Sequence, residues 1–351
     1  MLFRPGRVAA SITGPLLLSL ALLGGVGCNK AEKAREAAAA AEAMLKAGDL
    51  PGASAAYDAA LAEYPKSVEV ATGAAYMSLL AGDGAKADQI LAAVEPDAGE
   101  QLPQIKLRRA LVAAHGGDLE KAKEHGLASG LPAGKLLAAE VNLADGERDT
   151  ASGLLKDVQS APGELGQLAG QYLELMGDEN PMVAGLSEAQ ALWILGERKV
   201  AVQSAEELVM NLPNDRKDRD EMLMIWASRA ASIGETAVAR SLLEATIFPP
   251  EGQAWRKVAT TAIAACADGD GATCTSLFTS LEGAAPEDGL ADARATAAFL
   301  IAPKDKDVAA QLAGPYVSNA AARALFEAGD VSAATAAAPG GILASWLKAG
   351  G

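Results

Sequence analysis

The sequence is poor in the residues that carry most enzyme chemistry and most base stacking. Aromatic residues make up 4% of its 351 residues, and it contains two histidines and three cysteines. Basic residues are also scarce, since 30 Lys and Arg stand against 45 Asp and Glu, for a formal net charge of −15. Nucleic acids and anionic lipid headgroups repel such a chain, so we expect no nucleic-acid partner.

Motifs for phosphate binding and nucleophilic catalysis are missing as well. The sequence has no Gly-rich phosphate loop followed by Lys-Ser or Lys-Thr, and no Gly-x-Ser-x-Gly elbow. His115 and His125 lie ten residues apart, with no Cys or close pair of carboxylates at ligand spacing beside them. Two histidines without further ligands are a poor zinc site. We therefore expect no metal, no cofactor and no catalytic residue.

Alternating runs of β-branched residues, which are typical of half-buried strands, are absent from the sequence too. Hydrophobic residues make up 50% of the chain, and most of them are Ala and Leu, which favour helices. The composition therefore predicts an all-α fold. Internal periodicity decides whether the chain forms compact domains or one elongated array.

The N-terminal 28 residues have the pattern of a targeting segment. Arg4 and Arg7 precede an apolar stretch over residues 8–23, and the small residues 24–27 lead to Cys28. This pattern resembles a bacterial lipoprotein signal, in which the Cys thiol receives a diacylglycerol and the peptide is cut just before it. The resemblance implies removal of the segment before Cys28. An ordinary secretory signal and an uncleaved anchor helix are the alternatives.

The same resemblance implies where the mature protein lies. Several acyl chains on Cys28 hold a protein on a membrane, whereas one chain alone binds marginally. Asn29 after the Cys implies the outer membrane, with the protein facing the periplasm. Helical pattern begins soon after Cys28, so we expect residues 28–33 to form a short lipidated tether and the first helices to lie close to the bilayer.

A turn glycine recurs along the rest of the chain. In "GDLPGASAAYDAALAEYP", residues 48–65, a Gly-Asp pair is followed by a small residue five places after the Gly. The same arrangement of Gly and a following polar residue is found at Gly48, Gly82, Gly117, Gly146, Gly196, Gly234, Gly269 and Gly329. The small residues five places on are Ala53, Ala87, Ala122, Ala151, Ala201, Ala239, Cys274 and Ala334.

An alanine also stands seven residues before each of these glycines. These alanines are Ala41, Ala75, Ala110, Ala139, Ala189, Ala227, Ala262 and Ala322. If each Gly ends one helix and starts the next, the two small residues lie on facing sides of a helical hairpin and let its backbones approach closely. Gly suits such a turn because it adopts a positive φ without a Cβ clash.

The pattern and its spacing resemble the tetratricopeptide repeat, a helix-turn-helix unit of 34 residues. The resemblance implies that residues 34–351 form an α-solenoid of stacked antiparallel helix pairs, with degenerate central and C-terminal units. Wide gaps between turn glycines predict extra or eroded helices around residues 163–180 and 289–313. A short C-terminal helix with Ile342, Trp346 and Leu347 on one side is expected to cap the last hairpin.

In the tetratricopeptide family, the first helices of the units line a groove that accepts a segment of a partner protein. The family's groove positions correspond here to Tyr76, Leu79, Leu80, Gln190, Trp193, Ile194, Glu221, Met224 and Ser228. Aromatic and Met side chains on one face, in a chain so poor in aromatics, suit recognition of a partner. Packing between repeat units remains the alternative explanation for Trp193.

Two further features of the sequence allow more than one interpretation. Cys266 and Cys274 lie on the two helices of one predicted hairpin, so they form either a disulfide, which the envelope permits, or two buried small hydrophobic residues. The charged stretch "NDRKDRDE", residues 214–221, alternates in sign and precedes a helix, which predicts a solvated helix start.

These patterns together favour a non-enzymatic scaffold, tethered to a membrane, that binds another protein of the bacterial envelope. One alternative is an envelope enzyme whose active site lies in the irregular insertions at residues 163–180 or 289–313, although these segments contain no His and no Cys. Another is a module that binds a small molecule or a glycan. The scarcity of aromatic residues for stacking on sugars disfavours the glycan.

Overall fold

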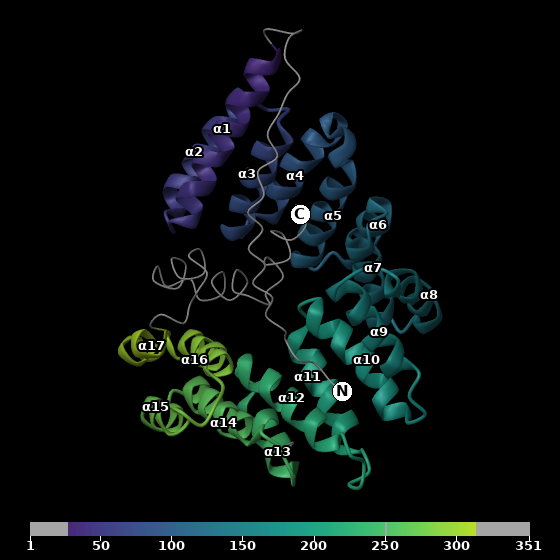
Figure 1. Ribbon diagram of the computed structural model, residues 1–351, viewed down its shortest axis with the longest axis vertical. Coiled ribbons are helices and arrows are strands. Elements are labelled where there is room, and N and C mark those ends of the chain that lie inside the picture. The colour runs from purple at the N-terminus through teal and green to yellow at the C-terminus, as the bar shows by residue number, and fades with distance from the viewer. Residues whose placement is uncertain (1–26, 250, 314–351) are drawn as a thin grey trace.

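The computed structural model describes residues 27–249 and 251–313, and all regular secondary structure in these ranges is helical. Successive helices pack on one another in chain order and follow an open curve from α1 to α17 (Figure 1). The predicted all-α solenoid is thus confirmed for this part of the chain. The predicted signal segment, the hairpin at Gly329 and the capping helix with Trp346 lie outside the described residues, apart from Gly27.

The described helices have the following bounds: α1 Gly27–Lys46, α2 Leu50–Glu63, α3 Val68–Leu80, α4 Gly84–Val94, α5 Leu102–His115, α6 Leu119–Ser129, α7 Pro132–Ala144, α8 Arg148–Gln159, α9 Glu164–Met176, α10 Pro181–Ile194, α11 Arg198–Met210, α12 Arg219–Ser232, α13 Thr236–Ala245, α14 Ala254–Asp268, α15 Gly271–Ser280, α16 Glu287–Ile301 and α17 Lys306–Ala313. Two short 3₁₀ helices, Glu95–Asp97 and Gly99–Gln101, join α4 to α5.

The helices form hairpins and two layers. The hairpins are α1–α2, α3–α4, α5–α6, α7–α8, α10–α11, α12–α13, α14–α15 and α16–α17, and α9 stands between two of them without a hairpin partner. First helices also pack on the first helices of neighbouring hairpins, as α7 does on α10, α12 on α14 and α14 on α16. We call the first helices of the hairpins the inner layer and the second helices the outer layer.

The turn glycines and their small partners have the predicted geometry. The seven described turn glycines have φ values between +76° and +96°, a region that favours Gly because it lacks a Cβ. All seven described alanines before the turns, and all seven small residues after them, have no solvent exposure. The small side chains therefore lie where the two helices of a hairpin approach each other, and the predicted register is confirmed.

Aspartates explain why Gly-Asp starts several of the second helices. Asp49, Asp83, Asp118 and Asp270 each follow a turn glycine, and each side chain accepts a hydrogen bond from the backbone N–H three residues on. The donor–acceptor distances lie between 2.9 and 3.2 Å. Such N-caps satisfy a backbone donor that a helix start otherwise leaves unpaired.

Both wide gaps between turn glycines are filled by regular helices. Residues 163–180 contain α9, which packs on α8 and α10, while α10 packs directly on α7. Residues 289–313 contain α17 and most of α16, which form a hairpin of their own. The residues between α16 and α17, numbers 302–305, include no Gly, and for this reason a search for turn glycines does not find this unit.

Helix α1 includes the predicted lipidation site. Cys28 is its second residue, so residues 28–33, which we expected to act as a tether, belong to a helix of 20 residues. No helix among the described residues combines the length and the apolar character needed to cross a bilayer.

The cysteine pair joins the two helices of one hairpin. Cys266 near the end of α14 and Cys274 in the first turn of α15 form a disulfide in the structure, with their Cα atoms 5.3 Å apart. Both residues are fully buried. Cys274 occupies the position at which the other described hairpins with a turn glycine have Ala, so the bond lies at the closest approach of α14 and α15.

Candidate functional site

The residues predicted to line a partner-binding groove differ in their exposure. Tyr76, Leu79, Leu80, Gln190 and Met224 are buried, and the four apolar ones are not surface residues in this conformation. This corrects the expectation that all of the positions face an open groove, because residues of the inner layer are enclosed on several sides by neighbouring helices.

Solvent reaches four of the predicted groove residues, which are Trp193, Ile194, Glu221 and Ser228. Trp193 is half-buried, and Ile194, the last residue of α10, is 40% exposed. Ser228 on α12 is exposed, and Glu221 at the start of the same helix is half-buried. The part of the predicted groove that a partner can contact therefore centres on the C-terminal end of α10.

Two arginines and two tryptophans stack at this end of α10. The guanidinium of Arg198, on α11, lies 5.2 Å from the centre of the Trp193 ring, and that of Arg229, on α12, lies 5.3 Å from the same ring. Arg229 also lies 4.4 Å from the Trp226 ring. Guanidinium groups over aromatic faces gain electrostatic attraction, which increases as water is excluded. We call these four residues the Arg–Trp stack.

A small hollow adjoins the Arg–Trp stack. It has a volume of about 20 Å³, roughly the space of one water molecule, and is lined by Leu175, Leu186, Gln190, Met222, Ile225, Trp226 and Arg229. These residues come from α9, α10 and α12, so the single helix α9 supplies one wall. Most of the lining is apolar, and Gln190 and Arg229 add one amide and one cation. Such a mixture offers mainly apolar contact to a partner that covers the hollow.

Burial lowers the pKa values of the arginines around the hollow. Loss of hydration lowers the pKa of Arg229 to about 10, and the same cause lowers the pKa of Arg198. Within the described part of the chain, Arg198 makes no ion pair with a carboxylate, whereas it does stack on Trp193. Cationic groups at a half-buried apolar surface favour a ligand that brings negative charge or carbonyl oxygens.

A buried polar pair lies deeper in the same part of the molecule. The Tyr172 hydroxyl, on α9, donates a hydrogen bond of 3.2 Å to Glu140 Oε1, on α7. Desolvation raises the pKa of Glu140 to about 8, although the hydrogen bond from Tyr172 acts in the opposite direction. Burial, and then the neighbouring Glu140, raise the pKa of Tyr172 well above its ordinary value. Both side chains are enclosed, so the pair has no open path to a substrate in this conformation.

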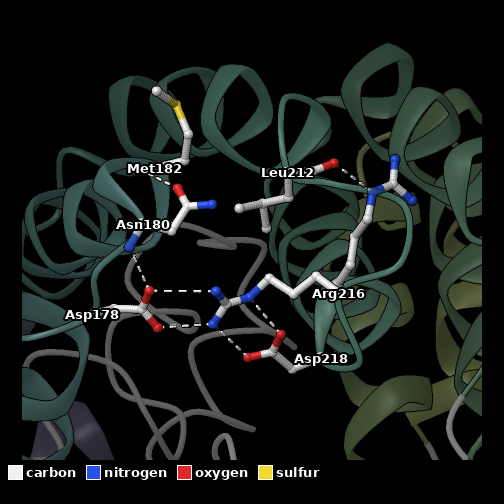
Figure 2. A network of polar contacts seen from close by, with 7 residues as sticks. Asp178, Asn180, Met182, Leu212, Arg216 and Asp218 are labelled. Carbon is white, nitrogen blue, oxygen red and sulfur yellow. Dashed lines mark hydrogen bonds and ion pairs between the residues drawn. The ribbon is translucent and has the colours of Figure 1, made fainter.

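A second polar cluster connects two loops on the edge of the solenoid. The Arg216 guanidinium lies between two carboxylates and donates to Asp178 Oδ2 at 2.8 Å and to Asp218 Oδ1 at 2.6 Å (Figure 2). Asp178 also accepts from the backbone N–H of Asn180, and Asn180 caps α10. The cluster thus ties the segment before α10 to the segment before α12.

The same cluster corrects the expectation for residues 214–221. Arg219 is buried and donates to the carbonyl oxygens of Leu212 and Ala245, at 3.2 and 3.1 Å. Arg216, whose pKa is raised first by its hydrogen bond to Asp218 and then by the one to Asp178, is half-buried. The charges in this stretch do not all face solvent, because some of them hold loops together.

The two histidines are separate from these clusters. His115 ends α5 and His125 lies within α6, and both are half-buried. Desolvation lowers the pKa of His115, and it is also the largest cause of the lowered pKa of His125, followed by the charge of Arg109. Across the residues that the structure describes, no three His, Cys, Asp or Glu side chains come together in a group able to hold a metal ion.

The chain matches none of the protein-family models with which it was compared, and none of the curated proteins. The fold itself defines the class of the described region, an α-solenoid of antiparallel helix hairpins.

Proposed function

We propose that this chain is a non-enzymatic scaffold of tetratricopeptide-like repeats, tethered to a membrane through lipid on Cys28, that binds another protein of the bacterial envelope. The observation that carries the proposal is the surface at the end of α10. There, exposed Ile194 lies next to half-buried Trp193, which stacks with Arg198 and Arg229.

The composition of this surface suits a protein segment as ligand. Trp and Arg are the residues most often found at the energetic centres of protein interfaces, and they lie together here in a chain with four tryptophans. Ile194 and the exposed part of Trp193 offer apolar contact to a partner, and the Arg198 guanidinium stacked on Trp193 adds a cation that suits carbonyl or carboxylate oxygens. The helices that hold these groups are fixed before binding, which lowers the entropic cost of association.

The proposed tether would hold the solenoid at a bilayer without spanning it. Lipid on the second residue of α1 would connect directly to the solenoid, with no flexible linker between. A scaffold held in this way meets partners in or close to the same membrane, which suits a role in the assembly or maintenance of an envelope complex. The outer membrane, facing the periplasm, is the location that the lipoprotein resemblance implies.

The proposal is tested by placing a charge on the surface without disturbing the core. Ile194→Asp adds a carboxylate at a side chain that is 40% exposed, and Met210→Asp adds the same group at the end of the outer helix α11, where Met210 is 41% exposed. Each variant and the native chain are expressed in the source bacterium, crosslinked in the cell and purified from detergent-solubilised envelope. Thermal unfolding by circular dichroism establishes that all three chains are folded.

We expect one defined protein partner with the native chain and with Met210→Asp, and its loss with Ile194→Asp. Retention of the partner by Ile194→Asp, or no partner with any chain, would overturn the proposed binding surface. The tether is tested separately with Cys28→Ala, which should move the protein from the membrane fraction to the soluble periplasmic fraction. A Cys28→Ala variant that remains with the membrane would contradict lipid attachment at this residue.

A further inference from the structure

The short loop between α13 and α14 exposes two large apolar side chains. Ile247 is 57% exposed and Phe248 is 79% exposed, more than any other large hydrophobic residue in the described part of the chain. The sequence contains only five phenylalanines. Burying an aromatic ring contributes more to stability than burying most other side chains, so leaving one in water forgoes that gain.

The backbone of this loop is held by side chains of two other helices. The carboxylate of Asp220, on α12, accepts from the backbone N–H of Ile247 at 3.3 Å and from that of Phe248 at 2.6 Å. Arg219 donates to the carbonyl of Ala245 at 3.1 Å, and Lys257, on α14, donates to the carbonyl of Thr246 at 3.2 Å. Three charged side chains thus fix the segment that carries the exposed pair.

These charged groups are themselves withdrawn from water. The Arg219 side chain is 7% exposed and the Asp220 side chain 16%, and they form an ion pair of 3.6 Å. Removing charges from water costs free energy, which their hydrogen bonds offset. The loop end that Asp220 stabilises contributes little to the core, because its two large side chains point outward. The cluster therefore presents Ile247 and Phe248 in a fixed conformation, which favours binding because little freedom is left to lose.

The surroundings of the loop indicate the chemistry of what binds it. Glu244 and Glu251, on either side of the exposed pair, are both exposed, while Lys257 is engaged with the Thr246 carbonyl. Acidic residues that flank an apolar protrusion in the sequence complement an apolar pocket with basic residues at its rim. The same acidic residues oppose approach to an anionic lipid surface.

The position of the loop also favours a protein, rather than a bilayer, as its binding partner. The junction of α13 and α14 and the start of α1 lie at opposite ends of the long axis (Figure 1). This step rests on the proposed function: if Cys28 carries the lipid, the loop faces away from the anchoring membrane. Ile247 and Phe248 do not line the hollow described above, although α12, which carries Asp220, also supplies four of its seven lining residues.

We propose that Ile247 and Phe248 form a second docking point, which inserts into an apolar pocket of a folded protein partner whose rim carries Lys and Arg. Phe248 is the anchor, and Asp220 is a positioning residue that holds the backbone of the loop. The acidic residues Glu244 and Glu251 pair with the basic rim.

The test uses the full-length chain in cells, with the photoreactive amino acid p-benzoylphenylalanine at position 248. The control carries the same probe at position 127, because Leu127 on α6 is also an exposed hydrophobic residue. The adduct at position 248 is identified by mass spectrometry, and the captured protein is then purified. Its affinity is measured for the native chain and for Phe248→Ala, Leu127→Ala, Asp220→Ala and the double variant Glu244→Lys/Glu251→Lys.

We expect one protein adduct at position 248 and none of that protein at position 127. Phe248→Ala should weaken binding at least tenfold and Leu127→Ala less than twofold. Asp220→Ala should weaken binding although Phe248 is present, and the double Lys variant should weaken it in a salt-dependent manner. Circular dichroism identifies any variant that fails to fold. Phe248→Ala removes only an exposed side chain, so its affinity still tests the docking point if another variant does not fold.

Three outcomes would overturn this docking point. They are equal labelling at positions 248 and 127, crosslinking of position 248 to lipid or to a second copy of the chain, and an affinity that Phe248→Ala leaves unchanged. Binding of the purified chain to phosphatidylcholine vesicles that is lost in Phe248→Ala would assign the loop to a bilayer instead. Loss of the partner in Ile194→Asp alone would support the surface at α10 and not this loop, so the two proposals can fail separately.

Discussion

The Tyr172 hydroxyl donates a hydrogen bond of 3.2 Å to Glu140 Oε1, and the two residues come from α9 and α7. This contact joins the only described helix without a hairpin partner to the inner layer of the solenoid. It lies among buried residues in which a charge is costly, because few polar groups are present to replace its hydration. The stability of this region therefore depends on the protonation of Glu140.

Glu140→Gln should stabilise the protein more at alkaline than at acidic pH. The folded-state pKa of Glu140 is about 8, against an ordinary value of 4.5, so the folded state holds a proton that the unfolded state releases between these values. The free energy of unfolding therefore falls as the pH rises through this range, at about 1.4 kcal/mol for each unit of pKa difference. Gln stays neutral at every pH and still accepts from Tyr172. Urea unfolding at pH 5, 7 and 9 measures the difference, which we expect to exceed about 1 kcal/mol at pH 9.

Glu174→Gln is the control for Glu140→Gln, because Glu174 is an exposed residue of the same helix as Tyr172. It should change the free energy of unfolding little at any of the three pH values. An equal effect of Glu140→Gln at pH 5 and pH 9 would contradict the raised pKa.

Ala87→Leu should destabilise the protein by about 1–3 kcal/mol. Ala87 has no solvent exposure and lies five residues after Gly82, where α3 and α4 are closest, so a larger side chain forces the helices apart. Ala85→Leu makes the same change at an exposed position of α4 and should cost less than about 0.5 kcal/mol. Thermal or urea unfolding of the two variants gives the comparison. A similar loss of unfolding free energy in both variants would mean that close packing at Ala87 does not cause the destabilisation.

Protein isolated from cells without reductant, with free thiols blocked during lysis, should contain the bond between Cys266 and Cys274. Alkylation followed by mass spectrometry should find no free thiol at either residue before reduction, and two after it. Because the bond closes a short loop of eight residues, its loss should lower the free energy of unfolding by about 2 kcal/mol, the low end of the usual range. Two free thiols in the native protein would show that the pair acts as buried hydrophobic residues instead.

Arg216→Met should destabilise the protein at neutral pH by about 1–3 kcal/mol, because Asp178 and Asp218 lose their shared donor. The hydrogen bond from Arg216 is the largest cause of the lowered pKa of Asp178, so the contribution of this pair is present above the ordinary pKa near 3.8. It is lost as the pH falls through the folded-state pKa. The difference between native and variant chains should therefore shrink below pH 4. A difference that stays constant from pH 7 to pH 3 would contradict this role.

The repeat could be predicted from the sequence because its determinants are local. A turn glycine, an alanine seven residues before it and a small residue five residues after it are set by the contact within a single hairpin. The hairpin of α16 and α17 has no turn glycine between residues 302 and 305, so the same rule misses it. The unpaired helix α9 could be predicted only from the wide gap between two turn glycines. No local sequence pattern indicates whether one helix or two fill that gap.

The polar contacts were harder to predict, because each depends on residues from distant units. Glu140 stands in the apolar stretch "LLAAEVNLA", which indicates burial but not the partner, because Tyr172 lies 32 residues on. Arg219 lies in a stretch that reads as solvated, yet it bonds the carbonyl of Ala245 at the end of the next helix. Burial of the groove positions likewise reflects how the inner helices stack, which single-unit periodicity does not determine.

The end of α10 is the surface at which we expect a partner protein to bind. The most direct test places p-benzoylphenylalanine at position 194 or at position 210 of the full-length chain, whose native side chains are 40% and 41% exposed, and illuminates living cells. The account predicts a discrete protein adduct at position 194 that is absent at position 210 and is lost when Trp193→Ala is added. Adducts of equal yield at both positions, or none at position 194, would contradict it.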